Sequence, residues 1–394
     1  MKKILIIGAG FLQDFVIRKA KQLGYETLAV DGNPDAVGLK SADKYSVVNI
    51  VDEEACLEYA KKEQVDGVLT AATDFGVLSA AYVAENMGLP GISYETAKLI
   101  KNKYLVRKRL YEFNVDDMGR TYEVDANTDL YELGRELNFP VIVKPCDGSG
   151  SRGVTEVASG DKLADACSCA MAYSITRRAV IEPFVKGREY GAESLVVNGE
   201  VHVLSVMRKW MTEPPYYAEL GHAVPTDLAP AVEARAKKCV ENAIRALGIE
   251  FGSVNMDMLI SSDGKIHIVD VGARMGGNMI GPCVIPYGTG IDYMANMIKN
   301  AVGDETDWNE SEHGTVATRL LAFGGGVIKQ LPDFETLEKQ YGVEIYHHMK
   351  VGQVVNKYRT NLDGCGYIIA TASSTDMAAS NAEAVLNEIR KTIF

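Results

Sequence analysis

The feature that most constrains the fold is a regular alternation of strand and helix patterns over about the first ninety residues. Short apolar runs typical of buried strands are each followed by a segment with helical spacing of apolar residues. Parallel strands joined by helices form a sheet with helices on both faces, so the pattern predicts an α/β domain. The expected strands are KKILIIG (2–8), YETLAVDGN (25–33), KYSVVNI (44–50) and VDGVLTAATD (65–74), and the expected helices are 11–24, 52–64 and 75–88.

The first of these strands runs into GAGFLQ, which matches part of the glycine fingerprint of dinucleotide-binding proteins. Gly8 and Gly10 occupy two of its three small-residue positions, but the third is Gln13. Asp31 stands about twenty residues further on, where an acid binds the ribose in such proteins. A Gly-x-Gly after a strand also serves simply to turn the chain tightly. An NAD-dependent oxidoreductase is therefore one hypothesis, and a plain turn is the other.

Composition excludes several classes of partner. The 394 residues include 41 Lys and Arg and 53 Asp and Glu, a formal charge of −12 at pH 7. Nucleic acids and anionic membranes bind basic faces, so we expect neither as a partner. No uninterrupted apolar run is long enough to span a bilayer. Seven irregularly placed cysteines suggest neither a metal site nor a disulfide framework, so we expect a soluble protein of the reducing cytoplasm.

From Ser93 onwards, strand and helix patterns are mixed. Ser93 is a suitable N-cap for one long helix over 94–113. Two strands are expected around the Asn-Gly turn at 198–199, and two more, 251–261 and 265–275, flank the turn SDGK. After about residue 308, three further strands and a terminal helix over 375–393 form a last segment.

A lysine followed by a Gly- and Ser-rich loop marks IVKPCDGSGSRGV (142–154). The familiar phosphate loop has its lysine at the end and leads into a helix. Here Lys144 precedes the loop and a strand pattern resumes at Val154, so the segment is either a nucleotide site of another design or a flexible hairpin. A buried ammonium group needs an anion, and phosphate oxygens would supply one. The residues that would bring backbone N–H groups and hydroxyls to phosphate are Gly148, Ser149, Gly150, Ser151 and Gly153.

Two acids on one predicted hairpin suggest a metal site. Asp257 and Asp270 lie mid-strand among apolar neighbours, one on each strand. Two buried carboxylates on adjacent strands repel unless a cation or a shared proton intervenes. Mg²⁺ prefers one or two carboxylates together with phosphate oxygens and water. A structural ion pair is the alternative, although neither strand has a basic residue in its core.

The ordered set of segments from Lys103 to Asn278 resembles the ATP-grasp superfamily, in particular the carboxylate-amine (L-amino acid) ligases. The resemblance implies a Rossmann-like pre-ATP-grasp domain (1–95), a two-lobed ATP-grasp domain (96–308) with a mobile lid at about 118–185, and a small C-terminal α+β domain (309–394). Members activate a carboxylate as an acyl-phosphate, which an amine or other nucleophile then attacks. ATP and Mg²⁺ are the implied cofactors, with Mn²⁺ as an alternative metal ion.

The resemblance also implies roles for particular residues. Lys103 and Lys144 would reach the phosphates, and Arg152 would meet either the transferring phosphoryl group or only solvent. In VIEPFVKGREY (180–190), Glu182 would accept from the adenine amino group and Glu189 would hold the ribose hydroxyls. The backbone around Phe184 and Val185 would pair with the purine edge.

Further positions match the family's metal and substrate sites. Asp257 and Asp270 match its two acidic metal ligands, where Glu is more usual, and Gly272 replaces a common Asn. Arg274 would face the γ-phosphate and the acyl-phosphate. The expected substrate-binding residues are Gly276, Gly277 and Asn278, with Lys209 and His222 from the aromatic, proline-rich segment 208–228, interpreted as a loop.

We therefore expect an ATP-dependent ligase that joins a carboxylate to an amine, with an L-amino acid as one substrate. A homodimer is the oligomeric state that we consider for it. One alternative is an ATP-grasp carboxylase or formate-dependent transferase of purine biosynthesis, whose VDGNPDA-like segment this chain also resembles. Another is a non-catalytic nucleotide-binding or regulatory protein.

Overall fold

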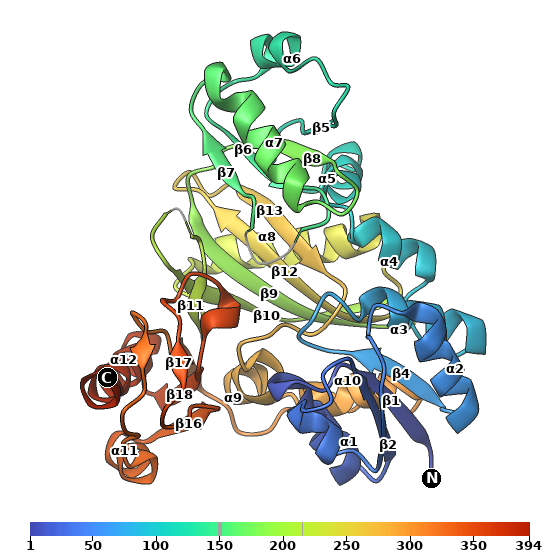
Figure 1. Cartoon of the computed structure of the whole chain (residues 1–394), viewed down its shortest axis with the longest axis vertical. Coiled ribbons are helices and arrows are strands. Elements are labelled where there is room, and N and C mark those ends of the chain that lie inside the picture. Colours follow the sequence, from blue (N-terminus) through green and yellow to red (C-terminus); the bar gives the residue numbers. More distant parts are fainter. Residues whose placement is uncertain (149–151, 215) are drawn as a thin grey trace.

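The computed structural model of the protein describes residues 1–148, 152–214 and 216–394. Over these residues the strands form four sheets, of which one has eight strands. This large sheet lies at the centre of the molecule (Figure 1). A lobe with strands β5 to β8 lies above it, and the N-terminal domain and the C-terminal segment lie below it on opposite sides.

The N-terminal domain has the predicted α/β architecture, with a four-stranded parallel sheet in the order β3-β2-β1-β4. Alternate residues of β1 face opposite sides. Ile4 and Ile6 pack in the core with α1, whereas Leu5 and Ile7 pack with α2 and α3. The bounds are β1 Lys3–Ile7, α1 Phe11–Gln22, β2 Glu26–Asp31, β3 Lys44–Val47, α2 Glu53–Glu63, β4 Gly67–Thr70 and α3 Val77–Met87.

The upper lobe is an antiparallel sheet in the order β5-β8-β6-β7, covered by α7. The segment after Lys144 therefore joins two antiparallel strands, β6 and β7, and does not lead into a helix, as the sequence predicted. The bounds are β5 Tyr122–Val124, α6 Leu130–Glu136, β6 Val141–Pro145, β7 Thr155–Val157, α7 Leu163–Tyr173 and β8 Ala179–Pro183.

The central sheet runs in the order β13-β12-β9-β10-β11-β14-β18-β16. On one face, apolar residues of β9, β12 and β13 pack against the long helix α8 and against α5. Residues on the opposite face of the sheet include most of the charged side chains of the candidate active site. The bounds are β9 Arg188–Val197, β10 Glu200–Met211, β11 Glu219–Val224, α8 Pro230–Ala246, β12 Gly252–Ile260 and β13 Ile266–Gly272.

The C-terminal segment continues this sheet instead of forming a sheet of its own. β14 pairs with β11 at Ala223↔Ala317 and Val224↔Val316, and β18 and β16 follow. The helices α12 and α11 lie in the same segment, and a short ladder joins β15 to β17. The bounds are α9 Ile285–Thr289, α10 Tyr293–Ala301, β14 Thr315–Leu320, β15 Gly326–Val327, α11 Phe334–Tyr341, β16 Val343–His347, β17 Val354–Val355, β18 Gly366–Ala372 and α12 Thr375–Ile393.

The prediction of one helix over 94–113 was wrong, because the chain forms two, α4 (Tyr94–Ile100) and α5 (Lys103–Glu112). Asn102 has an extended backbone, and its side chain accepts a hydrogen bond from the N–H of Leu105, so it caps α5. The N–H of Lys103 donates to the carbonyl of Cys146 at 2.7 Å. The interruption between α4 and α5 therefore places Lys103 beside the end of β6.

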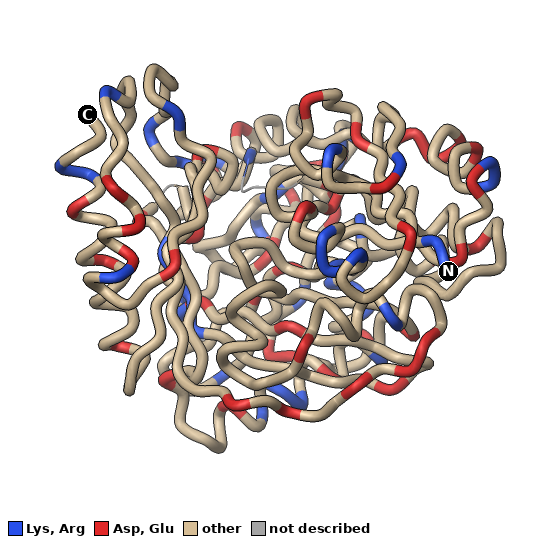
Figure 2. Tube along the Cα trace, turned by 90° about the horizontal axis from the view of Figure 1, so that it is seen from below, with Lys and Arg blue, Asp and Glu red and all other residues tan. Residues whose placement is uncertain are grey.

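Charged residues of both signs are interspersed along the outer helices (Figure 2). The acidic surplus is thus spread over many elements. Within the ranges that the structure describes, no helix is both long and apolar enough to cross a membrane.

Candidate active site

One face of the central sheet gathers the charged residues, because side chains two apart along a strand share a face. The strand register aligns them in rows that cross several strands. These rows are Glu193–Asn255–Gly272, Gly191–Asp257–Asp270 and Lys209–His222.

Asp257 and Asp270 are direct cross-strand partners on β12 and β13. Both side chains are partly exposed, at 29% and 46%. Each is paired with a lysine from another element: Asp257 with Lys209 of β10 at 2.7 Å, and Asp270 with Lys103 of α5. The sequence argument, which looked for cations only within the two strands, therefore missed these ion pairs and overestimated the burial of the two acids.

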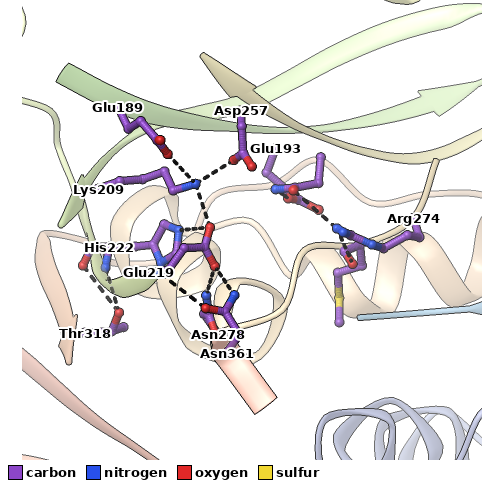
Figure 3. Close-up of polar contacts among 12 residues, drawn as sticks. Glu189, Glu193, Lys209, Glu219, His222, Asp257, Arg274, Asn278, Thr318 and Asn361 are labelled. Atoms are coloured by element: carbon purple, nitrogen blue, oxygen red, sulfur yellow. Dashed lines mark hydrogen bonds and ion pairs between the residues drawn. The ribbon is translucent and has the colours of Figure 1, made fainter. Parts of the chain in front are cut away.

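Lys209 is the centre of an acidic cluster (Figure 3). Its Nζ lies 2.6 Å from Glu219 Oε1, 2.7 Å from Asp257 Oδ1 and 3.3 Å from Glu189 Oε2, and its side chain is 1% exposed. Although burial acts to lower the pKa of Lys209, the charges of the three carboxylates raise it well above its usual value. Burial raises the pKa of Asp257 to about 6. At Glu219, the charge of Lys209 outweighs the effect of burial and lowers the pKa of that carboxyl group to about 2.

Residues distant in sequence hold Glu219 in this cluster. Asn278 donates a hydrogen bond to its Oε2, and Asn361 of the C-terminal segment donates to the same oxygen at 2.8 Å. The Tyr358 hydroxyl donates to the backbone carbonyl of Glu219. The C-terminal segment thus forms part of the candidate site.

His222 does not lie in a loop, as its sequence context suggested, but in β11. Its backbone N–H donates to Thr318 Oγ1 at 2.9 Å. The imidazole ring is 1% exposed, and its Nε2 lies 3.8 Å from Glu219 Oε1. Burial lowers the pKa of His222 to about 4, so the ring is neutral at pH 7. The aromatic and proline-rich composition of the segment concealed this strand.

Arg274 links the central sheet to the N-terminal domain. Its Nε donates to Asp74 Oδ1 at 2.9 Å, and its NH1 donates to Asn255 Oδ1 at 3.2 Å. Asp74 follows β4, and nearby the N–H of Ala72 donates to the carbonyl of Met275 at 3.0 Å. Despite burial, the charge of Arg274 holds the pKa of Asp74 below its usual value.

Glu193 is a residue of the site that the sequence analysis missed. Its carboxylate is fully buried and accepts from the N–H of Gly276 at 3.0 Å, the hydroxyl of Tyr293 at 2.5 Å and the amide of Asn255 at 2.9 Å. A Cβ on Gly276 would lie 2.9 Å from Glu193 Oε2, which explains the glycine. Burial raises the pKa of Glu193 to about 7. A lone glutamate inside the apolar strand GAESLVV was the available signal.

In the upper lobe, Lys144 already has an anionic partner. Its Nζ lies 2.7 Å from Glu182 Oε2 of the neighbouring strand β8, and the two side chains are 8% and 1% exposed. Glu182 Oε1 is buried and has no hydrogen-bond partner among the described residues. The backbone N–H of Phe184 donates to the carbonyl of Pro140 and is therefore already hydrogen-bonded within the protein. The next residue, Val185, is partly buried.

The structure describes part of the loop that follows Lys144. Arg152 is exposed, and Gly148 is partly buried. Gly153 has a φ of +73°, and a Cβ there would lie 2.8 Å from the Tyr173 ring, so this position requires glycine. The predicted phosphate-binding residues Ser149, Gly150 and Ser151 lie outside the described residues.

Asp257 and Asp270 fit a divalent cation that is held also by phosphate oxygens, since the described residues contain no group of three or more His, Cys, Asp or Glu side chains that could hold a metal ion by themselves. The carboxylates of Asp257, Asp270, Glu189 and Glu219 are accompanied by the ammonium groups of Lys209 and Lys103, and this leaves two negative charges on a face of oxygen donors. The unpartnered Glu182 Oε1 next to Lys144 marks a place for a hydrogen-bond donor from a ligand.

The GAGFLQ turn has an internal structural role. Gln13 Nε2 donates to the carbonyl of Ala71 at 2.5 Å, and a Cβ on Gly8 would contact the Gln13 side chain at 3.6 Å. Asp31 Oδ2 accepts from the N–H of Ala9 at 2.8 Å. These contacts support the tight-turn interpretation, because Gln13 and Asp31 are engaged within the domain.

Comparisons with known proteins agree with the fold. Residues 137–282 match the ATP-grasp domain family, and residues 319–393 match L-amino acid ligase C-terminal domain 2. The protein y4rH of Sinorhizobium fredii is 24% identical over 324 residues, covering 81% of this chain and 66% of that protein. A formate-dependent phosphoribosylglycinamide formyltransferase of Bacteroides thetaiotaomicron is 26% identical over 275 residues, covering 64% of this chain and 66% of that enzyme.

The structure of L-amino acid ligase from Bacillus licheniformis superposes with a TM-score of 0.84 at 23% identity, covering 99% of this chain and 98% of that chain. The fold is therefore that of an ATP-grasp enzyme with an L-amino acid ligase type C-terminal domain. Residues 137–282 thus carry an ATP-grasp domain and residues 319–393 a domain of the L-amino acid ligase type, and members of the ATP-grasp ligase family form C–N bonds and use ATP and Mg²⁺.

Proposed function

We propose that the protein joins a carboxylate to the amine of a second substrate at the expense of ATP, and that at least one substrate is an L-amino acid. The carboxylate oxygen would form a bond to the γ-phosphorus as the bond to the β-phosphate oxygen breaks, giving an acyl-phosphate and ADP. The amine nitrogen would then form a bond to the acyl carbon, lose a proton and displace phosphate.

The observation that carries this proposal is the contact between the C-terminal segment and the acidic cluster. Asn361, within the part matched to L-amino acid ligases, donates to Glu219, which shares Lys209 with Asp257. The domain typical of L-amino acid ligases is thus built into the face that carries the two candidate metal ligands.

Within this proposal, charge neutralisation is the main task of the side chains. Lys103 and Lys144 would hold phosphate oxygens after exchanging their present carboxylate partners. Asp257 and Asp270 would hold Mg²⁺, with Mn²⁺ as a possible substitute; when bound, the metal ion reduces the charge of the phosphates. Arg274 would stabilise the charge that develops on the transferring phosphoryl group.

The surplus of carboxylates near Lys209 also suits a substrate ammonium group, while Arg274 suits a carboxylate. An amino acid carries both charges. We further propose a cytoplasmic location, small-molecule partners and a homodimer as the assembled state.

A second candidate is the formate-dependent purine enzyme, which the similarity to the Bacteroides transferase supports. Its substrate carries a phosphoribosyl group, whereas the face around Glu219 is acidic. We therefore favour the amino acid ligase.

The test is release of ADP and phosphate with Mg-ATP over a panel of amino acids, singly and in pairs, with the amide product identified by mass spectrometry. Asp270→Ala serves as the inactive variant, and Asp263→Ala, in the exposed turn after β12, serves as its matched control. Turnover that requires a particular pair, persists in Asp263→Ala and vanishes in Asp270→Ala is the expected result. Stimulation by formate with a phosphoribosyl amine, and by no amino acid, would establish the second candidate instead.

A further inference from the structure

Lys101 lies beside the candidate active site, and the family resemblance assigns it no role. It is the C-cap of α4, and Lys103 is the first residue of α5. The helix α4 lies between α3 and α5 (Figure 1), and its Ala97 packs in one core cluster with Val77 and Ala81 of α3. Lys101 therefore stands where the N-terminal domain meets the helices that lead into the ATP-grasp domain.

The ammonium group of Lys101 faces the loop after β4. Its Nζ donates to the backbone carbonyl of Asp74 at 3.2 Å and lies 5.8 Å from the centroid of the half-exposed Phe75 ring. The side chain of the same Asp74 pairs with Arg274. Lys101 thus contacts the residue that orients the arginine of the proposed phosphoryl transfer.

Lys101 has no carboxylate partner within the ranges that the structure describes. No carboxylate oxygen there lies within 4.0 Å of its Nζ, whereas Lys103, Lys144 and Lys209 each have one or more such partners. The residues outside these ranges, 149–151 and 215, are Ser, Gly, Ser and Pro, which carry no carboxyl side chain. Lys101 is partly buried, and a buried ammonium group needs an anion. A ligand could supply that anion.

The carboxylates that act on Lys101 at longer range already have closer partners. Asp74 pairs with Arg274, and Asp270 pairs with Lys103. Burial lowers the pKa of Lys101, and the attraction of the carboxylates opposes this only in part. Three cations thus share two acids here, whereas carboxylates are in excess around the acidic cluster. A further negative charge would therefore stabilise this end of the site.

The surroundings suit a carboxylate better than a phosphate. Lys101 offers a single uncompensated positive charge, which matches a monoanion, and the Phe75 ring offers a surface for the carbon chain that carries it. The lysines that we propose for ATP lie toward the upper lobe, since Lys103 adjoins the end of β6 and Lys144 pairs within that lobe. Lys101 lies toward the N-terminal domain instead.

We propose that Lys101 binds the carboxylate that the amine substrate retains, so that this substrate is an amino acid and not a simple amine. This inference rests on the proposed ligase function and assigns a specificity-determining residue to it. The amine nitrogen and the carboxylate of an α-amino acid are joined to the same carbon. A carboxylate held beside Asp74 therefore keeps the amine close to the acyl-phosphate at Arg274.

The test compares Lys101→Met, which removes the charge and keeps an unbranched side chain, with Lys101→Arg, which keeps the charge. Lys98→Met, in the exposed pair with Glu95 on the same helix, is the matched control. For each variant, kcat and KM for ADP release are measured with L-alanine or L-phenylalanine as the amine substrate and with the corresponding amide, L-alaninamide or L-phenylalaninamide. The carboxylate substrate identified in the amino acid panel is kept saturating.

We expect the wild type to prefer each amino acid over its amide in kcat/KM. Lys101→Met should reduce this ratio about tenfold or more, mainly through KM, because only the carboxylate loses a charge-assisted hydrogen bond. Lys101→Arg should recover part of the ratio, and Lys98→Met should match the wild type. A general effect of the substitution on folding would change both values equally and leave the ratio unchanged.

Two kinetic results would overturn the proposal while leaving the ligase function intact. The first is an equal loss for the amino acid and its amide, or no loss for either, in Lys101→Met. The second is a higher KM for ATP with an unchanged ratio, which would assign Lys101 to the phosphates of ATP.

Direct binding separates a failure of this inference from a failure of the ligase function. Saturation-transfer NMR with L-phenylalanine, L-phenylalaninamide and ribose 5-phosphate, each alone, is performed on the wild type and Lys101→Met in the presence of Mg-ADP. Stronger binding of phenylalanine than of its amide, lost in Lys101→Met, supports the carboxylate site even if no amino acid stimulates ADP release, a result that would remove only the ligase function. Binding of ribose 5-phosphate that depends on Lys101, or no binding that depends on it, would overturn the assignment.

Discussion

Arg274 and Asp74 form an ion pair across 200 positions of the sequence, with Nε 2.9 Å from Oδ1 and NH2 3.4 Å from Oδ2. The pair joins the loop after β13 to the loop after β4 of the N-terminal domain. The N-terminal domain thereby orients the guanidinium group that we propose acts on the transferring phosphoryl group.

We expect Asp74→Asn to lower kcat about tenfold with a smaller change in the KM for ATP, because Arg274 loses a charged partner but keeps its own charge. Asp74→Glu should recover part of kcat, and Asp35→Asn, at an exposed site of the same domain, should have no effect. Steady-state kinetics of ADP release checks this. An Asp74→Asn enzyme with unchanged kcat would mean that Arg274 needs no such support.

The buried pair Lys144–Glu182 allows its structural role to be separated from nucleotide binding. Lys144→Met leaves a buried carboxylate unpaired and should destabilise the protein by about 3–5 kcal/mol. The double variant Lys144→Met/Glu182→Gln should recover most of this stability. It should still bind ATP at least about tenfold more weakly, because the phosphates lose their ammonium group.

Urea unfolding and calorimetric titration with ATP measure the two effects. Arg178→Met, in the more exposed pair with Glu123 of the same lobe, is the control and should change both little. Full ATP affinity in the double variant would show that Lys144 has only a structural role.

Lys209 supplies the one ammonium group shared by three carboxylates, so Lys209→Met should make the protein depend on divalent cations for stability. We expect a lower melting temperature in EDTA than for the wild type and a larger rise on addition of millimolar MgCl₂, because the cation then relieves the repulsion among Glu189, Glu219 and Asp257. NaCl at the same ionic strength separates specific binding from screening. An equal response to both salts would argue against a cation site at these acids.

The raised pKa of Glu193 predicts that the free energy of unfolding depends on pH. Its pKa rises from 4.5 to about 7 on folding because the carboxyl group is buried. The folded state therefore binds more protons than the unfolded state between these values, and the contribution of Glu193 is complete below pH 4.5 and lost as the pH rises through 7. The loss amounts to about 3 kcal/mol at most.

Urea midpoints of the wild type and Glu193→Gln over this range isolate the effect, since other titrating groups are common to both proteins. The stability of the wild type relative to Glu193→Gln should fall as the pH rises from about 4.5 to 7. A constant difference would show that the carboxyl group titrates near its ordinary value in the folded protein.

The sequence anticipated the N-terminal sheet and the hairpin of Asp257 and Asp270, because local periodicity specifies which residues are buried and which strands are adjacent. It also anticipated that Lys144 precedes a loop between two strands. It was wrong about the single helix over 94–113, because a side-chain cap at Asn102 overrode a continuous helical pattern. It placed His222 in a loop, because a strand in the interior of a sheet is stabilised by neighbours distant in the chain.

The sequence by itself determined most of the elements, their order and the identity of most of the charged residues, since these depend on local spacing and on resemblance along the chain. Only the tertiary structure decided the partners of these charges: Lys209 with three acids, Lys103 with Asp270, Asp74 with Arg274 and Glu193 beneath Gly276. The physical reason is that a charge partially removed from water requires compensation within a few ångströms, and the register of the central sheet and the contacts between domains decide which residues come that close.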